Sequence, residues 1–162
     1  LSLASMMSNS GAWGSGWPSL KVALQMVKRP SKTSSGLDNS VQTLQLIGSS
    51  KYPVTDAYLR AMILAESKRA RNPLSYFRQM AAINLAADRS ELLASLKMPV
   101  LVISGEDDPL AQVSGGIETA SHIPHATLRI LSGVGHDLPK PLLGDFAQMI
   151  TQNAIQSCAL NI

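Results

Sequence analysis

Three successive patterns of apolar and polar residues run along this chain, and each predicts a different kind of element. Residues 2–7 form a short run of apolar and small side chains that stops at a cluster of turn formers over 8–11. Such a run predicts a buried strand followed by a loop. The loop continues through a glycine-rich stretch that contains Trp13 and Trp17.

The second pattern covers residues 18–96 and has the spacing of amphipathic helices, with apolar residues three and four positions apart. Stretches rich in Ser, Lys and Gly separate these segments, so we predict a layer of four or five helices. The predicted helices are one with Leu20, Leu24 and Val27 on one face, one with Val41, Leu44 and Ile47, one from Thr55 or Asp56 through Arg69, one opened by Pro73 with Phe77, Met80, Ala81 and Leu85 on one face, and a short one that ends near Leu96 and begins with a capping box of Asp88 and Glu91.

The last third of the chain alternates strand-like and helix-like sequence. Residues 99–103 are a continuous run of aliphatic and β-branched side chains, which is typical of a strand buried on both faces of a parallel sheet. A helix over 109–121, a strand over 126–131 and a helix over 142–156 follow. This order predicts a right-handed parallel crossover, and therefore an α/β fold with three parallel strands.

Composition and charge exclude several classes of protein. With 162 residues, 45% of them apolar, the chain is long enough for one core and too short for two ordinary domains. Residues 1–97 hold 12 basic and 5 acidic residues, whereas residues 98–162 hold 2 basic and 6 acidic residues. The opposite charge of the two segments indicates that they have different roles. The basic clusters lack interleaved aromatic residues, so we interpret them as solvated helix ends and predict no nucleic-acid partner. These clusters are Lys28, Arg29 and Lys32, and Lys68, Arg69 and Arg71.

Cys158 is the only cysteine, which excludes an internal disulfide and a cysteine-based zinc site. No apolar run approaches the roughly 18 residues that a membrane span needs. The first residues also lack the basic stretch and long apolar run of a secretion signal. We therefore predict a soluble, cytoplasmic protein with no membrane partner.

Two polar loops follow the two strands of the last third. Residues 105–109 read Gly-Glu-Asp-Asp-Pro, and 133–137 read Gly-Val-Gly-His-Asp. Because neighbouring parallel strands lie about 4.8 Å apart and end at the same edge of a sheet, a carboxylate from one loop can reach an imidazole from the other. Such a pair supplies the acid and the histidine of a catalytic triad. Each loop also has a plainer interpretation, because Asp-Pro commonly opens a helix and glycine-rich turns often hold a histidine.

These stretches resemble a known family. Residues 98–110 (MPVLVISGEDDPL) and 133–139 (GVGHDLP) look like the end of the α/β-hydrolase fold. They are most similar to its esterase and lactonase-like branch, which includes aclacinomycin methylesterase and enol-lactonases. Residues 5–11 (SMMSNSG) resemble the strand that follows the nucleophile helix in that branch. The resemblance covers essentially all of this chain, but only the C-terminal half of the family's domain.

The resemblance implies a domain organisation. Residues 1–17 correspond to a core strand and its loop, 18–97 to an inserted helical cap over the site, and 98–162 to the C-terminal part of the α/β-hydrolase core. The implied fold is thus half of a hydrolase core, with three parallel strands and a cap.

The resemblance also implies a site. The family's Gly-x-x-Asp pattern places the triad acid at Asp108, with Asp107 as the second choice, and the triad histidine at His136. Trp13 and Trp17 are expected to line the substrate pocket, although packing between layers would also explain two aromatic residues in a loop. No metal and no organic cofactor is implied.

The family's nucleophile has no counterpart in this sequence. It lies on a Gly-x-Ser-x-Gly elbow before the strand that corresponds to residues 2–7, and that motif occurs nowhere here. We therefore expect a fragment of a serine hydrolase for a small apolar ester or lactone, inactive by itself. An apolar edge strand at 2–7 is expected to pair with the missing N-terminal half or with a second copy.

Two further hypotheses remain open from the sequence. The scaffold can serve as a non-catalytic binding or assembly module, which the loss of the nucleophile half favours. Alternatively, the intact protein is a haloperoxidase, a dehalogenase or a carbon–carbon bond hydrolase, because all of these resemble this half equally well. The nucleophile and the oxyanion loop would separate these chemistries.

Overall fold

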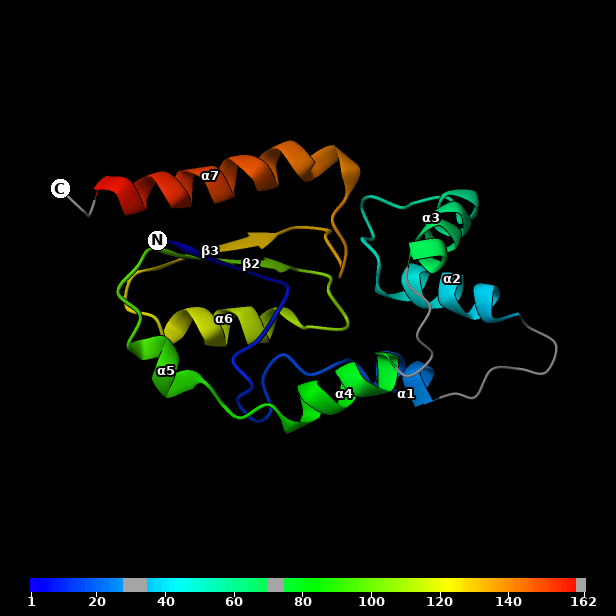
Figure 1. Ribbon diagram of the computed structural model, residues 1–162, viewed down its shortest axis with the longest axis horizontal. Coiled ribbons are helices and arrows are strands. Elements are labelled where there is room, and N and C mark those ends of the chain that lie inside the picture. The colour runs from blue at the N-terminus through cyan, green and yellow to red at the C-terminus, as the bar shows by residue number, and fades with distance from the viewer. Residues whose placement is uncertain (28–34, 70–74, 160–162) are drawn as a thin grey trace.

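The computed structural model describes residues 1–27, 35–69 and 75–159 (Figure 1). Within these ranges the strands are β1 (Leu3–Met6), β2 (Val100–Gly105) and β3 (Ala126–Leu131). The helices are α1 (Leu20–Val27), α2 (Gly36–Ile47), α3 (Asp56–Arg69), α4 (Ser75–Leu85), α5 (Ser90–Ala94), α6 (Val113–Ser121) and α7 (Leu143–Ala159), with a short 3-10 turn, η1 (Lys140–Leu142), before α7.

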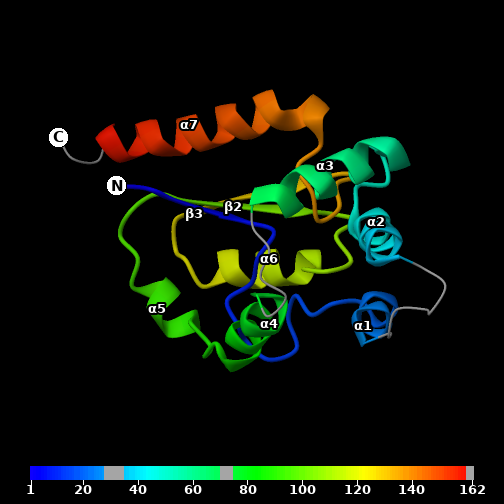
Figure 2. The ribbon, with the colours of Figure 1, turned by 45° about the vertical axis from the view of Figure 1, so that its right-hand side comes forward.

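The three strands form one parallel sheet in the order β1-β2-β3. All six residues of β2 are buried, as its continuous apolar run predicts. Side chains alternate between the faces of a strand, so Val100 and Val102 pack with Ile123 on the α6 side, whereas Leu101 and Ile103 pack with Phe146 of α7. Helices α6 and α7 thus cover opposite faces (Figure 2). The predicted α/β fold with three parallel strands is confirmed.

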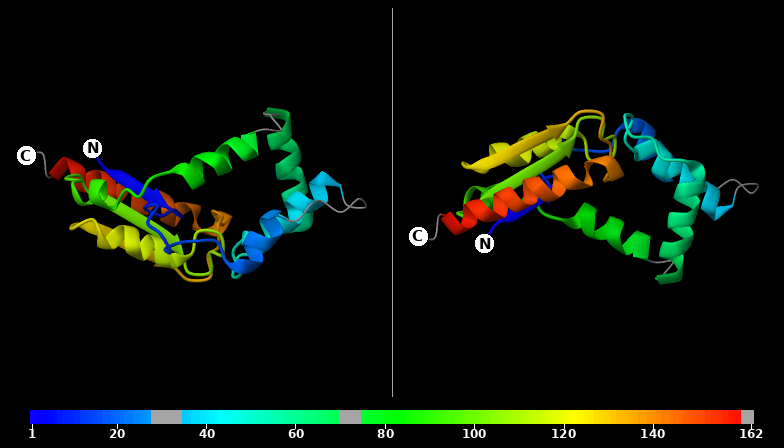
Figure 3. Two further views of the ribbon diagram at one scale, coloured as in Figure 1. Left: turned by 90° about the horizontal axis from the view of Figure 1, so that it is seen from below. Right: turned by 90° about the horizontal axis from the view of Figure 1, so that it is seen from above.

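Helices α2 and α3 lie beyond the carboxyl ends of the strands (Figure 1). In both views of Figure 3, α1, α2 and α3 lie on one side of the molecule, and the N-terminus and the last turns of α7 lie on the opposite side. Helices α2 and α3 pack on each other, with Val41, Ile47 and Leu59 buried. This helical layer lies beyond the edge where the polar loops emerge (Figure 1). We call residues 18–97 the cap after the expectation from the sequence, and their part in covering a substrate site stays a prediction.

Helix α6 begins later than its sequence predicts. It starts at Val113 rather than at residue 109. The carboxylate of Asp108 accepts hydrogen bonds from the amides of Leu110 and Ala111, and the regular helix begins only beyond these residues.

The capping box predicted from Asp88 and Glu91 is wrong. Arg89 is the N-cap of α5 and makes no side-chain cap. Asp88 instead accepts a hydrogen bond from the amide of Ser90, two residues on, in an Asx-type turn. A capping box does form at the start of α2, between Ser35 and Asp38.

Some residues named from the sequence lie outside the described residues: Lys28, Arg29, Lys32, Arg71 and Pro73. The side chains of Val27, Phe77 and Cys158 do as well. Within the described ranges, no helix combines the length and apolar character needed to cross a bilayer.

Candidate catalytic site

Asp108 lies at the carboxyl edge of the sheet, just after β2 ends at Gly105. Its side chain is fully buried. Oδ1 accepts hydrogen bonds from the amides of Leu110 and Ala111, both at 2.8 Å. A buried carboxylate has only acceptor atoms and needs donors to replace the water it has lost. The main chain thus satisfies Oδ1 and leaves Oδ2 for another donor.

That donor is His136, in the loop after β3. Its Nδ1 lies 2.8 Å from Oδ2 of Asp108. With the carboxylate ionised, Nδ1 carries the proton of this hydrogen bond, which leaves Nε2 of the neutral ring as an acceptor. The imidazole side chain is 30% exposed, whereas the carboxylate is 0% exposed. The pair is therefore anchored at the acid and open at the histidine, which is the arrangement that proton transfer to or from a third group requires.

The glycines beside His136 let its loop fold tightly against the rest of the chain. Gly133 has a φ of +72°, in the left-handed region that favours glycine. Gly135 packs against the main chain between α2 and α3, because a Cβ at this position would lie 2.5 Å from the carbonyl oxygen of Gly48. The two glycines of the Gly-x-Gly-His sequence therefore have different roles. Gly133 adopts a left-handed backbone conformation, and Gly135 allows the close approach to the main chain of Gly48.

The connection between α2 and α3 holds residues 133–137, which we call the histidine loop. The amide of His136 donates to the carbonyl of Ile47 at 2.7 Å. The amide of Gly135 donates to Oγ of Ser49 at 3.0 Å, and the Ser49 hydroxyl donates to Oδ1 of Asp137. Nothing in the sequence signals these contacts, since a serine in a polar loop ordinarily faces water.

Asp107 lies beside Asp108 in the chain but contacts a different partner. Its side chain accepts a hydrogen bond from the hydroxyl of Ser50, and its amide donates to the carbonyl of Val134 at 3.0 Å. Asp108, not Asp107, is thus the aspartate that meets His136 in this structure.

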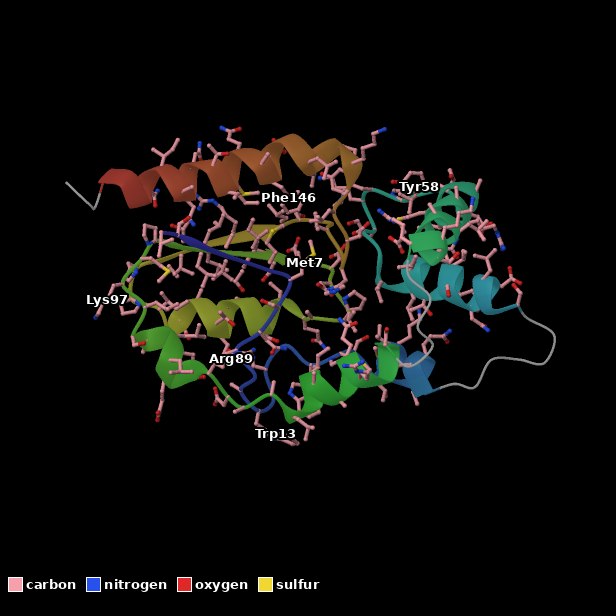
Figure 4. All side chains as sticks on the ribbon, in the orientation of Figure 1. Met7, Trp13, Tyr58, Arg89, Lys97 and Phe146 are labelled. Atoms are coloured by element: carbon pink, nitrogen blue, oxygen red, sulfur yellow. The ribbon has the colours of Figure 1, made fainter. Side chains whose placement is uncertain are left out.

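Trp13 and Trp17 contact each other edge to face, with ring centroids 4.7 Å apart. Trp13 is 88% exposed and Trp17 is 50% exposed. Figure 4 places Trp13 beyond α6, on the side of the sheet away from α7. The two rings are therefore available for further contacts, and their predicted part in a substrate pocket stays a prediction.

The other two histidines of the chain have local partners. His122 pairs with Glu118 on α6 at 2.7 Å, and His125 contacts the carbonyl of Met98 at 2.7 Å. Glu118 also accepts from the buried hydroxyl of Ser10 at 2.6 Å, which ties the loop after β1 to α6. In the part of the chain that the structure describes, no group of three or more His, Cys, Asp or Glu could hold a metal ion.

Solved structures of hydrolases share this architecture. A meta-cleavage product hydrolase from Pseudomonas fluorescens matches 94% of the chain with a TM-score of 0.69 and 17% identity. An N-acyl homoserine lactone degrading enzyme matches 93% with a TM-score of 0.58 and 20% identity. An esterase from Rhodococcus matches 91% with a TM-score of 0.55 and 23% identity. No protein-family model matches the chain.

The matched region is about half of each of these structures: 55% of the meta-cleavage product hydrolase, 57% of the lactone-degrading enzyme and 50% of the esterase. Together with the parallel sheet, its flanking helices and the order of the elements, this likeness shows that the chain has the C-terminal half of the α/β-hydrolase fold. At these identities the likeness establishes the fold alone.

Proposed function

We propose that this chain supplies the acid and the histidine of a catalytic triad that hydrolyses a carboxylic ester or lactone. The nucleophile, in this proposal, comes from polypeptide outside these 162 residues. The observation that carries the proposal is the 2.8 Å contact between His136 Nδ1 and Asp108 Oδ2, with the acid fully buried and the imidazole partly open. That combination of burial and exposure suits a proton relay better than a structural ion pair.

Each residue has a defined part in this reaction. Nε2 of His136 takes the proton of a serine hydroxyl as its oxygen attacks the carbonyl carbon, and the imidazolium then returns that proton to the departing alkoxide. Asp108 keeps the ring in the tautomer with the proton on Nδ1 and stabilises the imidazolium. Water then attacks the acyl intermediate by the same proton transfers, which releases the carboxylic acid product and regenerates the serine hydroxyl and the neutral His136. The proposed reaction requires no metal or cofactor.

The proposed partner of β1 is the polypeptide that carries the nucleophile. In the described residues β1 is an edge strand, and Leu3 and Ala4 are exposed on it. A cavity of about 330 Å³ runs along β1 and is lined in part by Arg89, Leu93 and Thr119. An incoming strand would pair with the open edge of β1, and the matched structures contain nearly as much chain again.

We assign Trp13 and Trp17 to the wall of an apolar acyl or alcohol pocket, together with the cap helices. The support is their large exposed area in a loop near the end of β1. A cytoplasmic location is part of the same proposal and rests on the lone cysteine.

A second candidate function is carbon–carbon bond hydrolysis by the same pair. The observation that favours it is the likeness to the meta-cleavage product hydrolase, with its TM-score of 0.69. A non-catalytic binding or assembly module is the third candidate, favoured by the lack of a Gly-x-Ser-x-Gly elbow in these residues.

The deciding experiment measures the intact mass and oligomeric state of the purified protein and then its hydrolysis of a short-chain nitrophenyl ester. We expect activity only when a second polypeptide is present, and a loss of at least about 10⁴-fold in kcat in Asp108→Asn, as for other triads. Asp145→Asn, an exposed acid on α7, is the matched control. An inactive homo-oligomer of 17.3 kDa chains would instead support the module.

A further inference from the structure

The contacts between the α2–α3 connection and the histidine loop carry an inference that rests on the proposed function. We propose that Ser49 is a positioning residue for His136. Its hydroxyl fixes the histidine loop in the arrangement that brings Nδ1 to Asp108. Part of the cap is then a component of the catalytic apparatus rather than only a cover over it.

The Ser49 hydroxyl contacts both neighbours of His136 in the chain. It accepts the Gly135 amide at 3.0 Å and donates to the carboxylate of Asp137. It therefore bridges the residues immediately before and after His136. Ser49 is only 5% exposed, so water cannot readily replace the hydroxyl. Removing it would leave a buried amide without an acceptor, which is costly.

The same connection also holds the main chain at and around His136. The carbonyl of Ile47, the last residue of α2, accepts the His136 amide at 2.7 Å. The carbonyl of Gly133 accepts the Lys51 amide at 3.2 Å. The end of α2 would otherwise have carbonyls without partners, so the helix and the histidine loop satisfy each other.

Together these contacts divide the positioning of His136 between two regions. The sheet region holds the ring, through Asp108, and the cap connection holds the main chain, through Ile47 and Ser49. The His136 ring can stay in contact with the fixed Asp108 carboxylate only if the main chain of His136 is held in place as well. Loss of the Ser49 hydroxyl should therefore weaken the Asp108–His136 hydrogen bond without touching either residue.

The test follows the Nδ1 proton of His136 by NMR in the full chain, since a proton shared with a carboxylate resonates far downfield and exchanges slowly with water. In Ser49→Ala we expect this proton to exchange about tenfold faster, the effect of losing one hydrogen bond. Ser49→Thr keeps the hydroxyl and should retain the slow exchange. Ser40→Ala is the matched control, because Ser40 donates to a main-chain carbonyl within α2, away from His136.

The outcomes separate this inference from the proposed function. If the downfield proton is present in the parent chain and unchanged in a folded Ser49→Ala, the positioning role is wrong and the proposed pair stands. If the parent chain shows no such proton, or Asp108→Asn leaves it unaltered, the proposed pair itself fails. Should Ser49→Ala not fold, Asp137→Ala removes the other partner of the hydroxyl at a half-buried position. There too, faster exchange supports the inference and unchanged exchange overturns it.

Discussion

The sheet region and the helical cap differ in how much apolar surface each buries by itself. Every residue of β2 is buried between α6 and α7. On α1, by contrast, Leu20 is 76% exposed and Leu24 55% exposed. The sheet region thus has apolar cores on both faces of β2, whereas the described helices of the cap bury few apolar side chains and leave others at the surface. The buried ones are Val22, Val41, Ile47 and Leu59. Folding free energy should be concentrated in the sheet, and the cap should depend on its contacts with the histidine loop.

The largest expected effect tests this contrast directly. Ile103→Ala removes side-chain atoms from a position that is 0% exposed and packs with Phe146. We expect it to lower the free energy of unfolding by about 2–5 kcal/mol, as for other large-to-small changes in a core. Leu24→Ala, at a position 55% exposed on α1, should change it by less than about 0.5 kcal/mol. Denaturant unfolding measures both changes in the free energy of unfolding. Equal losses in the two variants would show that Leu24 of α1 is buried in solution.

The next effect separates the two neighbouring aspartates. Asp108→Asn removes the charge from a buried hydrogen bond to His136, which should cost about 1.5–3 kcal/mol of unfolding free energy near neutral pH. Asp107→Asn changes an exposed side chain and should cost under about 0.5 kcal/mol. The measurement is again denaturant unfolding. A larger loss in the Asp107 variant would reverse the assignment of the acid.

Two glycine substitutions test the contact between the α2–α3 connection and the histidine loop. Gly135→Ala would place a Cβ against the main chain of Gly48, so either the cap connection or the histidine loop must move. We expect a loss of about 1–3 kcal/mol in the free energy of unfolding, as for overpacking elsewhere. Gly144→Ala lies on α7 with open space around it and should stabilise by up to about 1 kcal/mol. If both variants behave alike in thermal unfolding, the close approach at Gly135 does not exist.

The smallest effect concerns a polar contact within the cap. The Ser35 hydroxyl and then Arg60 hold the pKa of the Asp38 carboxyl below its ordinary value of 3.8. Because the folded pKa is depressed, the group contributes stability above pH 3.8 that is lost as the pH falls through the folded pKa. Ser35→Ala should move this pKa back toward its ordinary value, as measured by carboxyl NMR titration. An unchanged titration would mean that the capping box at α2 is not formed.

Most of the sheet region could be predicted from the sequence, and for a physical reason. The run at 99–103 is apolar at every position, and only a strand covered on both faces suits it. Parallel neighbours end at one edge, so the meeting of the loops that hold Asp108 and His136 follows from topology. The start of α6 is predicted too early because Asp-Pro commonly opens a helix, whereas here an irregular segment over residues 109–112 lies between Asp108 and Val113.

The contacts of the cap could not be predicted in the same way. Ser49 and Gly135 are 86 positions apart, and neither belongs to a repeating pattern that would pair them. The partner of Asp107 could not be predicted either, because Ser50 lies 57 positions away and no pattern pairs the two residues. Periodicity predicts which face of an element is buried, but contacts between irregular loops depend on how whole elements pack.

The hydrogen bond from the His136 amide to Ile47 limits how this scaffold can be re-engineered. A cap is an attractive module to exchange when a hydrolase is given a new substrate, since its helices can be replaced without altering the sheet. Here a graft that begins before Ile47 and ends after Ser49 would replace the hydroxyl that the histidine loop uses, and it would keep the main-chain acceptor at position 47 only where it preserves the backbone path there. Cap exchange should therefore keep residues 47–51 from this chain and vary the helices on either side.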